Sequence, residues 1–469
     1  MADEVLLNEL DAYLDANWDT IVEDITTLVQ IPSVEELDKA EPGAPFGPGP
    51  KAALTKVLEI AHNMGFETHD CDGYMGYADL PGESEKQLGI IGHMDVVPEG
   101  PGWNFPAYDV TEKDGYLIGR GTLDDKGPSV IALHAMKFWK DKGATFPYTI
   151  RFLFGTNEET GMNDVPYYRE RYADPAFLFT PDAEFPVCYG EKGGFDATIT
   201  SEAMPDRIVR ELTGGAATNA VPGEAEALVY VGNFEGDLPG TERITVQRDG
   251  EGYARILAKG KSAHASMPET GVNAIALLID YLLENGLCTH KEREFFNFER
   301  ELLDHTDGSG VGLKTSDEYF GPLTIIGGTI KTENDRFIQT VDSRFPTSTS
   351  GEEILETLTL AAGKVGADVE QTLLMVPFLV KPDTPVIQAL VKAYNDVTGE
   401  DAKPFTMGGG TYAREFTSGA SFGPEMPWLE QPEWVGSMHG PDEGVSIELL
   451  REAFRIYGVA IQQLMEIDL

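Results

Sequence analysis

Apolar positions in the first 185 residues follow two alternating patterns. Residues 4–30 carry apolar side chains three and four positions apart, which predicts an amphipathic helix, and a second helical stretch follows at 51–64. Beyond it, the apolar runs QLGIIGHMDVV, YTIRFLFGT and AFLFT are separated by polar or helical segments. Continuously apolar strands that alternate with helices are typical of a mostly parallel sheet covered on both faces. This part of the chain is therefore predicted to be α/β.

The pattern changes between about 187 and 380. Runs rich in β-branched residues, such as EALVYVG, RITVQ and LTIIGGTIK, are interleaved with predicted helices at 271–286, 291–304 and 351–365. After Pro382, helices return at about 384–398 and 446–465. We therefore expect an α/β domain with a mixed, mostly parallel sheet that is interrupted by an inserted α+β domain. The predicted boundaries are 1–185 and 382–469 for the α/β domain and 186–381 for the insertion.

Composition and charge narrow the functional classes. The 469 residues are 41% apolar and 24% charged, and no run approaches the roughly 18–20 apolar residues of a membrane-spanning helix. The formal charge, 35 − 79 = −44, argues against binding nucleic acid or an anionic membrane. Such acidity fits a solvated surface, adaptation to salt or a preference for cationic ligands, and composition does not separate these.

Two further features bear on the compartment. The start, MADEVLLNEL, lacks the basic residues and apolar block of a secretory signal. Cys71, Cys188 and Cys288 are far apart with no CxxC spacing, which supports neither a disulfide framework nor a thiolate zinc site. A cytoplasmic location is therefore expected.

The segment GHMDVVP is the first candidate for chemistry. His93 and Asp95 stand two positions apart just after an apolar strand, so both side chains leave the same face at the strand's end. A metal-binding imidazole needs its orientation fixed by a nearby carboxylate or carbonyl, which Asp95 can provide. An isolated His-x-Asp motif would also be found at a strand end whose polar residues have no function.

Three further strand ends or turns carry acidic residues. Asp124 lies in the Gly-rich turn GRGTLDDKG before a helix, where a carboxylate can bridge two metal ions, although the adjacent Asp125 is a rival. Glu158 and Glu159 follow the next strand, and adjacent carboxylates are costly unless a cation or a shared proton compensates them. Asp182 follows a fourth strand. Acids at successive strand ends match the position of binding sites in α/β sheets.

The motifs GHMDVVP, GRGTLDDKG, NEET, TPDAEFP, KSAHASMP and SMHGPDE together resemble the di-zinc aminoacylase and carboxypeptidase family, and within it the peptidase V type of dipeptidase. The resemblance covers nearly the whole chain. It implies a zinc-exopeptidase-like catalytic domain, a lid formed by the insertion, and hydrolysis of the peptide bond of dipeptides in the presence of two zinc ions. It also implies a role for each residue: Asp124 bridges the ions, His93 and Asp182 complete one, Glu159 and His439 complete the other, Asp95 orients His93, and Glu158 is the general base.

The chemistry of this set is coherent. Two imidazoles and three carboxylates suit zinc, with manganese or cobalt also possible. A water shared by two such ions would have its pKa lowered toward about 7. Glu158 would take the proton of that water and deliver it to the leaving amine, a contribution normally of about 10² to 10⁴ in rate.

The insertion contributes further candidates by the same resemblance. His264, at the tip of the small-residue turn GKSAHASMP, is implied to stabilise the oxyanion together with Asn219. Arg344 is implied to bind the substrate's terminal carboxylate, and its pairing with Asp342 at a strand edge is the alternative. The Gly-rich run 408–411 lacks the lysine and spacing of a phosphate-binding loop. We expect Gly409, Gly410 and Thr411 to line a backbone cradle for substrate, with a plain turn as the alternative.

The sequence leaves alternative functions open, and the length of the insertion bears on the assembly state. An N-acyl amino acid deacylase or a desuccinylase would use the same metal site, but the insertion of about 190 residues favours a dipeptidase. A non-catalytic binding protein of the same fold would be expected to lack Glu158, His439 or Asp124, and all three are present. The resemblance also implies that family members with a shorter lid complete their site with the lid of a second subunit. Here the insertion is long enough for two α+β lobes, and the second lobe could occupy the place of that second lid. A monomer is therefore predicted.

Overall fold

The computed structural model describes residues 4–232, 238–250 and 252–469. These form two compact units. The first unit comprises Met1–Gly190, Leu379–Phe405 and Gly410–Leu469, and the inserted unit comprises Glu191–Phe378 and Thr406–Gly409. The short segment Thr406–Gly409 therefore joins the inserted unit although the sequence analysis placed it in the α/β domain. Among the helices of the described ranges, none has the length and apolar character needed to cross a membrane.

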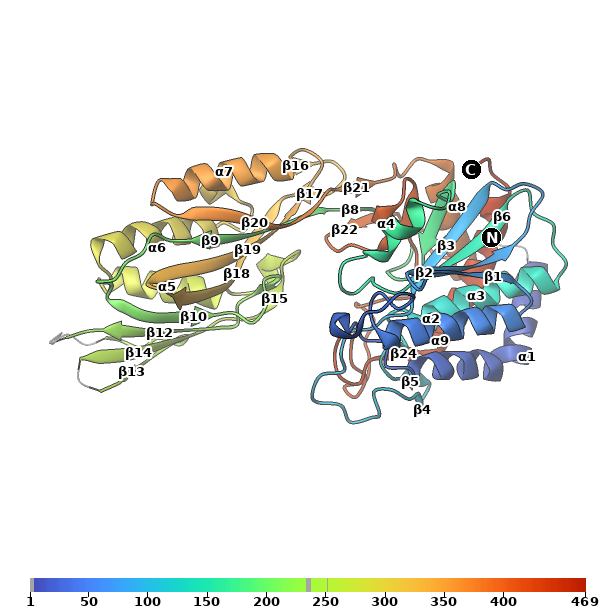
Figure 1. Cartoon of the computed structure of the whole chain (residues 1–469), viewed down its shortest axis with the longest axis horizontal. Coiled ribbons are helices and arrows are strands. Elements are labelled where there is room, and N and C mark those ends of the chain that lie inside the picture. The colour runs from blue at the N-terminus through green and yellow to red at the C-terminus, as the bar shows by residue number, and fades with distance from the viewer. Residues whose placement is uncertain (1–3, 233–237, 251) are drawn as a thin grey trace. The chain divides into compact units, whose positions relative to one another are not determined.

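The first unit is built on a nine-stranded mixed sheet in the order β1-β2-β6-β3-β7-β23-β8-β21, with β22 paired to β8 (Figure 1). Strands β6, β3, β7 and β23 run parallel, whereas β1, β2 and β8 pair antiparallel. The central strands are almost wholly buried, which is why their sequences read as continuous apolar runs. The strands are β1 (Glu67–Cys71), β2 (Met75–Leu80), β3 (Gln87–His93), β6 (Thr149–Gly155), β7 (Phe177–Thr180), β8 (Cys188–Glu191), β21 (Phe378–Leu379), β22 (Phe405–Met407) and β23 (Gly419–Ser421).

Helices cover this sheet. Helix α9 packs against α3 and α8, and α1 packs against α3 and α9, so that these helices form one layer (Figure 1). The helices predicted at 51–64, 384–398 and 446–465 are present with their ends shifted by a few residues. The helices are α1 (Glu4–Val29), α2 (Pro48–Asn63), α3 (Lys126–Asp141), α4 (Asp164–Arg169), α8 (Pro385–Thr398) and α9 (Ile447–Met465). A small sheet, β4 (Thr111–Lys113), β5 (Tyr116–Ile118) and β24 (Gly444–Ser446), lies off the main one.

The inserted unit has one continuous antiparallel sheet of eight strands, in the order β13-β14-β12-β10-β18-β19-β9-β20. Helices α5 (Ala274–Glu284), α6 (His290–Leu303) and α7 (Gly351–Gly363) share one apolar core with this sheet. The expected α+β construction is present, but in a single sheet rather than in two lobes. Its strands are β9 (Gly193–Thr200), β10 (Val209–Gly214), β12 (Glu224–Tyr230), β13 (Ile244–Arg248), β14 (Tyr253–Lys259), β18 (Thr324–Glu333), β19 (Arg336–Phe345) and β20 (Asp368–Met375), beside the short pairs β11 (Ala220–Val221) with β15 (Ala263–His264) and β16 (Ser316–Asp317) with β17 (Gly321–Pro322).

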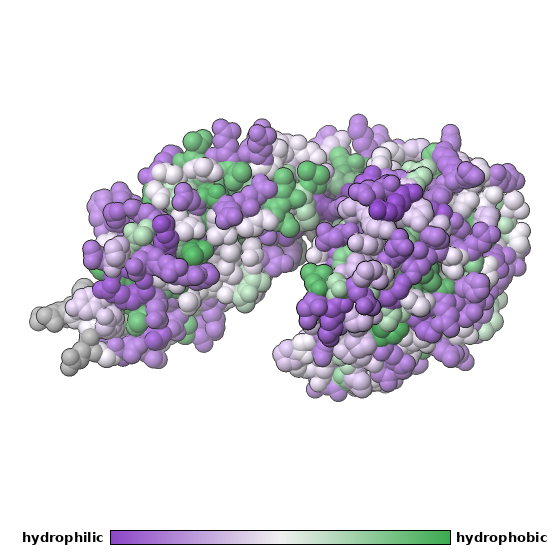
Figure 2. Space-filling model, in the orientation of Figure 1, coloured by the Kyte–Doolittle hydropathy of each residue, from purple (hydrophilic) through white to green (hydrophobic). Residues whose placement is uncertain are grey.

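The surface and the cysteines agree with the composition. Hydrophilic residues, drawn in purple, cover most of the visible face of each unit (Figure 2). This matches a chain with a formal charge of −44. Cys71, Cys188 and Cys288 are buried and free of disulfides, as their spacing predicted.

Candidate metal centre

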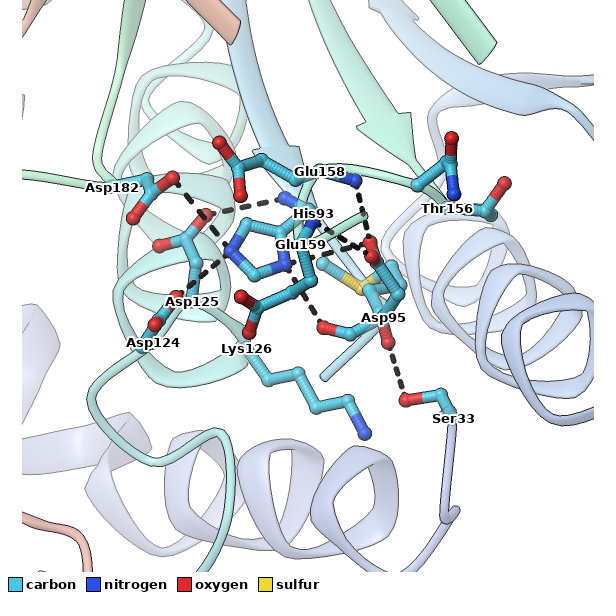
Figure 3. A network of polar contacts seen from close by, with 12 residues as sticks. Ser33, His93, Asp95, Asp124, Asp125, Lys126, Thr156, Glu158, Glu159 and Asp182 are labelled. Atoms are coloured by element: carbon cyan, nitrogen blue, oxygen red, sulfur yellow. Dashed lines mark hydrogen bonds and ion pairs between the residues drawn. The ribbon is translucent and has the colours of Figure 1, made fainter. Parts of the chain in front are cut away.

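Six predicted site residues of the first unit lie together where its parallel strands end: His93, Asp95, Asp124, Glu158, Glu159 and Asp182 (Figure 3). His93 is the last residue of β3, Glu158 and Glu159 follow β6, and Asp182 follows β7. Because β6, β3 and β7 are parallel neighbours, their carboxyl ends lie at one edge of the sheet. Asp124, in the turn before α3, completes this group.

Asp124 lies between two imidazoles. Its Oδ1 atom is 2.9 Å from Nε2 of His93, and its Oδ2 atom is 2.9 Å from Nε2 of His439. Each imidazole faces a second carboxylate: Nε2 of His93 is 3.7 Å from Oδ2 of Asp182, and Nε2 of His439 is 3.0 Å from Oε2 of Glu159. One carboxylate therefore separates two nitrogen-and-oxygen donor sets, which is the arrangement that a pair of bridged ions requires.

Asp125, the rival of Asp124, points elsewhere. Its Oδ2 atom accepts hydrogen bonds from Oγ of Ser129, at 2.8 Å, and from the backbone N of His93, at 3.3 Å. The buried carboxylate thus ties helix α3 to strand β3 and does not face His439. The peptide bond between Asp124 and Asp125 is cis, which the sequence analysis did not predict.

Asp95 orients the neighbouring residues in two ways (Figure 3). Its backbone oxygen lies 2.9 Å from Nδ1 of His93, whereas its carboxylate is 3.6 Å from the same nitrogen. The carboxylate instead accepts hydrogen bonds from the backbone N of Glu158, at 3.2 Å, and of Glu159, at 3.1 Å. Asp95 therefore fixes the imidazole through its main chain and fixes the two glutamates through its side chain.

The electrostatics of the cluster favour bound cations. Burial, reinforced by the charge of Asp182, raises the pKa of Glu158 well above its ordinary value, and burial with the charge of Asp124 raises that of Asp182 to about 7. Burial alone would raise the pKa of Asp124 too, but hydrogen bonds with His439 and His93 lower it. So many buried carboxylates are costly unless cations compensate them.

The types of donor atom in the cluster also suit divalent cations. Three sets of side chains have ligand atoms within 4.8 Å of one another: His93, Asp124 and Glu159; His93, Glu158 and Asp182; and Asp124, Asp182 and Glu425. The donors are imidazole nitrogens and carboxylate oxygens, which suit zinc, manganese or cobalt. The residues present therefore fit a pair of divalent ions.

Comparison with known proteins decides the family. The family model "Peptidase family M20/M25/M40" matches residues 89–463. The chain belongs to this family. It is 34% identical over 462 residues to "Putative dipeptidase SH1171" of Staphylococcus haemolyticus, with 95% of this chain and 97% of that protein covered. It is 30% identical over 457 residues to "Putative dipeptidase YtjP" of Bacillus subtilis, with 95% and 97% covered.

A solved structure confirms the fold. The crystal structure of human carnosine dipeptidase 1 matches with a TM-score of 0.60 at 15% identity, over 98% of this chain and 99% of that one. The predicted family, the predicted fold class and the prediction of a metallopeptidase are thereby confirmed. The alternative of a non-catalytic binding protein is not supported, since this M20 chain retains Glu158, His439 and Asp124.

The inserted unit of this M20 peptidase brings two predicted residues together. The backbone N of Ala265 donates to the backbone oxygen of Asn219 at 3.0 Å, and Ala220 pairs with His264 in the β11–β15 ladder. Nδ1 of His264 lies 2.8 Å from Oγ of Ser266. Partial desolvation, followed by the charge of Arg344, lowers the pKa of His264, which favours the neutral imidazole at neutral pH.

Arg344 pairs with Asp342, which is the alternative that the sequence left open for this residue. Its Nε and Nη2 atoms donate to the two oxygens of Asp342 at 2.9 and 2.7 Å, and Nη1 donates to the backbone oxygen of Gly408 at 3.2 Å. The guanidinium is thereby held in one orientation beside the Gly-rich run.

The Gly-rich run is divided between the two units. Gly409 has open space where a side chain would begin, whereas a Cβ atom at Gly410 would lie 2.5 Å from Nη1 of Arg414. Thr411 caps the short 3-10 helix Tyr412–Glu415, and its hydroxyl lies 2.9 Å from that of Ser421. The Thr411 side chain is therefore engaged within the protein.

Two functional candidates escaped the sequence analysis. Glu443, buried in SMHGPDE, accepts hydrogen bonds from the backbone N–H groups of Gly121, Leu123 and Asp124 and pairs with Arg120 at 2.5 Å. It thus holds the turn that presents Asp124, as partners of metal ligands commonly do. Its place in the SMHGPDE motif was the available signal. Glu425, beside Asp124 and Asp182, lies in a segment, GPEMP, that no motif singled out.

Proposed function

We propose that this M20 metallopeptidase is a dipeptidase that hydrolyses the peptide bond of dipeptides at a centre for two divalent ions. The observation that carries the proposal is the position of Asp124, with one carboxylate oxygen toward His93 and the other toward His439. The names of the relatives from Staphylococcus haemolyticus and Bacillus subtilis support the dipeptide as substrate.

The assignment of ligands follows the observed neighbours. Asp124 would hold both ions, His93 and Asp182 would complete one ligand set, and Glu159 and His439 would complete the other. Two zinc ions, or manganese or cobalt in their place, would supply a lowered pKa for a bound water and polarisation of the scissile carbonyl.

Glu158 moves the proton. Its carboxylate takes a proton from the attacking water and returns it to the leaving nitrogen of the substrate. Burial and the neighbouring charge of Asp182 raise the pKa of Glu158 above the ordinary value for a glutamate. A positioned carboxylate can accept a proton and then deliver it to a leaving group. The backbone N of Glu158 donates a hydrogen bond to Oδ1 of Asp95 at 3.2 Å, which fixes the start of the side chain.

The inserted unit supplies the groups for the rest of the substrate. His264, in β15, and Asn219, directly before β11, lie at the β11–β15 strand pair and are the donors for the oxyanion of the tetrahedral intermediate. Arg344 is the partner for the terminal carboxylate. Asp342 and Gly408 engage three of the five N–H groups of its guanidinium, so a substrate carboxylate would share it with them. The backbone of Gly409 and Gly410, with Thr411 beside it, is the proposed cradle.

The test separates the dipeptidase from the deacylase and desuccinylase, which the metal centre alone does not. Purified enzyme should hydrolyse members of a dipeptide panel and leave N-acetyl and N-succinyl amino acids largely intact. Treatment with a chelator should abolish the activity, and zinc, cobalt or manganese should restore it. Asp124→Ala should lose both ions, as measured by metal analysis, because a bridging ligand serves each. Full activity in a metal-free preparation would contradict the proposal.

A further inference from the structure

A pocket within the first unit adjoins the candidate metal centre. It has a volume of about 320 Å³. Two lining residues are direct neighbours of proposed ligands: Leu123 precedes Asp124, and Met438 precedes His439. The wall combines apolar residues, among them Met426, Leu449 and Val445, with further acidic ones, Glu430, Glu448 and Glu452. None of the described residues that line the pocket is basic.

Glu425 joins this pocket to the metal centre. The residue lines the pocket, and its carboxylate oxygen lies within 4.8 Å of ligand atoms of both Asp124 and Asp182. The residue is only 7% exposed, and its carboxyl group interacts with that of Asp182, while its Oε1 atom has no hydrogen-bond partner among the described residues. Its backbone N donates to the oxygen of Ala183 at 2.9 Å, which fixes the start of the side chain. A buried carboxylate oxygen without a donor is costly, so a ligand with N–H groups is expected to approach it.

A metal ion is not the best occupant for this oxygen. His93, Asp124 and Asp182 would already supply three protein ligands to one ion, which is the number that a catalytic zinc site takes before water or substrate fills the next position. A fourth protein ligand would close that position.

The geometry of a dipeptide places a cation there. The α-nitrogen is two bonds from the carbonyl carbon that is attacked, at about 2.5 Å. When that carbonyl lies at the metal centre, the α-ammonium group therefore lies within one hydrogen bond of the groups around it. An ammonium offers three N–H donors and a full charge, whereas an N-acylated nitrogen offers one N–H and no charge.

We propose that Glu425 binds the α-ammonium group of the substrate's N-terminal residue and that the adjoining pocket holds the side chain of that residue. This inference rests on the proposed dipeptidase function. It identifies the side chain by which the enzyme selects a free amino terminus over an acylated one.

The test uses the metal-loaded enzyme, the variant Glu425→Gln and a matched pair of substrates. The pair is leucyl-glycine and 4-methylpentanoyl-glycine, which differ only in that hydrogen replaces the α-ammonium group. Wild-type kcat/KM should be at least about 10² higher for leucyl-glycine, because the analogue leaves a buried carboxylate unpaired. In Glu425→Gln, kcat/KM for leucyl-glycine should fall by about 30-fold or more, mainly through KM, while the value for the analogue stays within about 3-fold.

The control is Glu433→Gln. Glu433 is exposed and lies in the same loop outside the pocket, so its variant removes the same charge and should keep the wild-type preference. Metal analysis of Glu425→Gln should show the wild-type content, and loss of one ion would make Glu425 a ligand and overturn the inference.

The wild-type measurement can overturn the inference even where the variant does not fold. A wild-type enzyme that cleaves leucyl-glycine and its analogue equally well would overturn the inference while leaving the dipeptidase function in place. An enzyme that cleaves N-acetyl amino acids but no dipeptide would overturn the function and the inference together.

Discussion

Two adjacent glutamates show how a single position changes the chemical role of a carboxylate. Glu159 places Oε2 at 3.0 Å from Nε2 of His439, and its Oε1 accepts a hydrogen bond from the backbone N of Val97 at 3.2 Å. Glu158 instead gathers with His93 and Asp182. Because Asp95 accepts from both backbone N–H groups, the two side chains are held apart in these different surroundings.

Exchanging each glutamate for glutamine should therefore have different effects. Glu158→Gln should keep both ions and lower kcat by about 10² or more, because only the proton transfer is lost. Glu159→Gln should lose one ion. Metal analysis and steady-state kinetics on the same preparations check this. If Glu158→Gln depletes metal while Glu159→Gln retains it, the two roles must be exchanged.

The sequence predicted those site residues that mark the end of a strand. His93, Glu158 and Asp182 each follow an apolar run, so their position was visible before the fold was known. Sequence spacing could not distinguish Asp124 from Asp125 as the metal ligand. The orientation of the Asp124 side chain depends on His439, which is distant in the sequence, whereas that of Asp125 depends in part on the nearby Ser129. No sequence pattern marks Glu425 as a site residue, because it comes close to Asp182 only through the packing of two loops.

At the scale of elements, helix α6 of the inserted unit is fixed by one side chain that does more than cap it. Glu292 closes a capping box with Thr289, and its two carboxylate oxygens also accept hydrogen bonds from the backbone N of Ile208, at 2.9 Å, and of Val209, at 2.8 Å. The residue is fully buried. It therefore ties α6 to the start of β10. In α7, Glu353 forms the same capping box with Ser350 at an exposed position.

Glu292→Ala should destabilise the chain by about 3 kcal/mol, because it leaves the buried N–H group of Val209 and the partly buried ones of Ile208 and Thr289 unpaired, at about 1–3 kcal/mol for each buried group. Glu353→Ala, the matched control, should cost about 1 kcal/mol or less, since water replaces the lost contacts. Urea unfolding followed by circular dichroism measures both. Amide hydrogen exchange should accelerate at residues 208–209 in the Glu292 variant only. Equal costs for the two variants would show that the link to β10 adds nothing.

Elements with a strong period were predictable, and short ones were not. The helices at 48–63, 385–398 and 447–465 carry apolar side chains at helical spacing, so only their ends were misplaced. The two-residue strands β11 and β15 are too short for any period. Thr406–Gly409 joins the inserted unit because Lys192 and Arg344 bind the backbone oxygens of Met407 and Gly408, which no local pattern shows.

At the scale of the whole molecule, the formal charge of −44 makes self-repulsion a general property of the folded chain. Salt shortens the range of that repulsion, from about 30 Å at 0.01 M to about 8 Å at 0.15 M. Raising sodium chloride from 0.01 to 0.3 M should therefore raise the midpoint of urea unfolding. A midpoint that falls with salt would show that the pairs between opposite charges outweigh the repulsion.

The last prediction concerns how many chains one metal centre needs. The resemblance to the di-zinc aminoacylase and carboxypeptidase family implies that a lid histidine serves the metal site. The long insertion, Glu191–Phe378 in one continuous eight-stranded sheet, leads us to predict that the enzyme works as a monomer with its own lid. His264→Ala should lower kcat by about 10² to 10³ without changing the metal content, as expected when one oxyanion donor is removed.

Mixing two inactive variants decides between one chain and two. His264→Ala keeps a complete metal centre and Glu158→Gln keeps the histidine, so a dimer that exchanges lid residues would form one intact centre in the mixture. We expect no recovery, because each monomer would lack one of the two groups. Light scattering at the assay concentration should show a single chain. Activity regained on mixing would prove that His264 acts on the centre of a second chain and would overturn the prediction of a monomer.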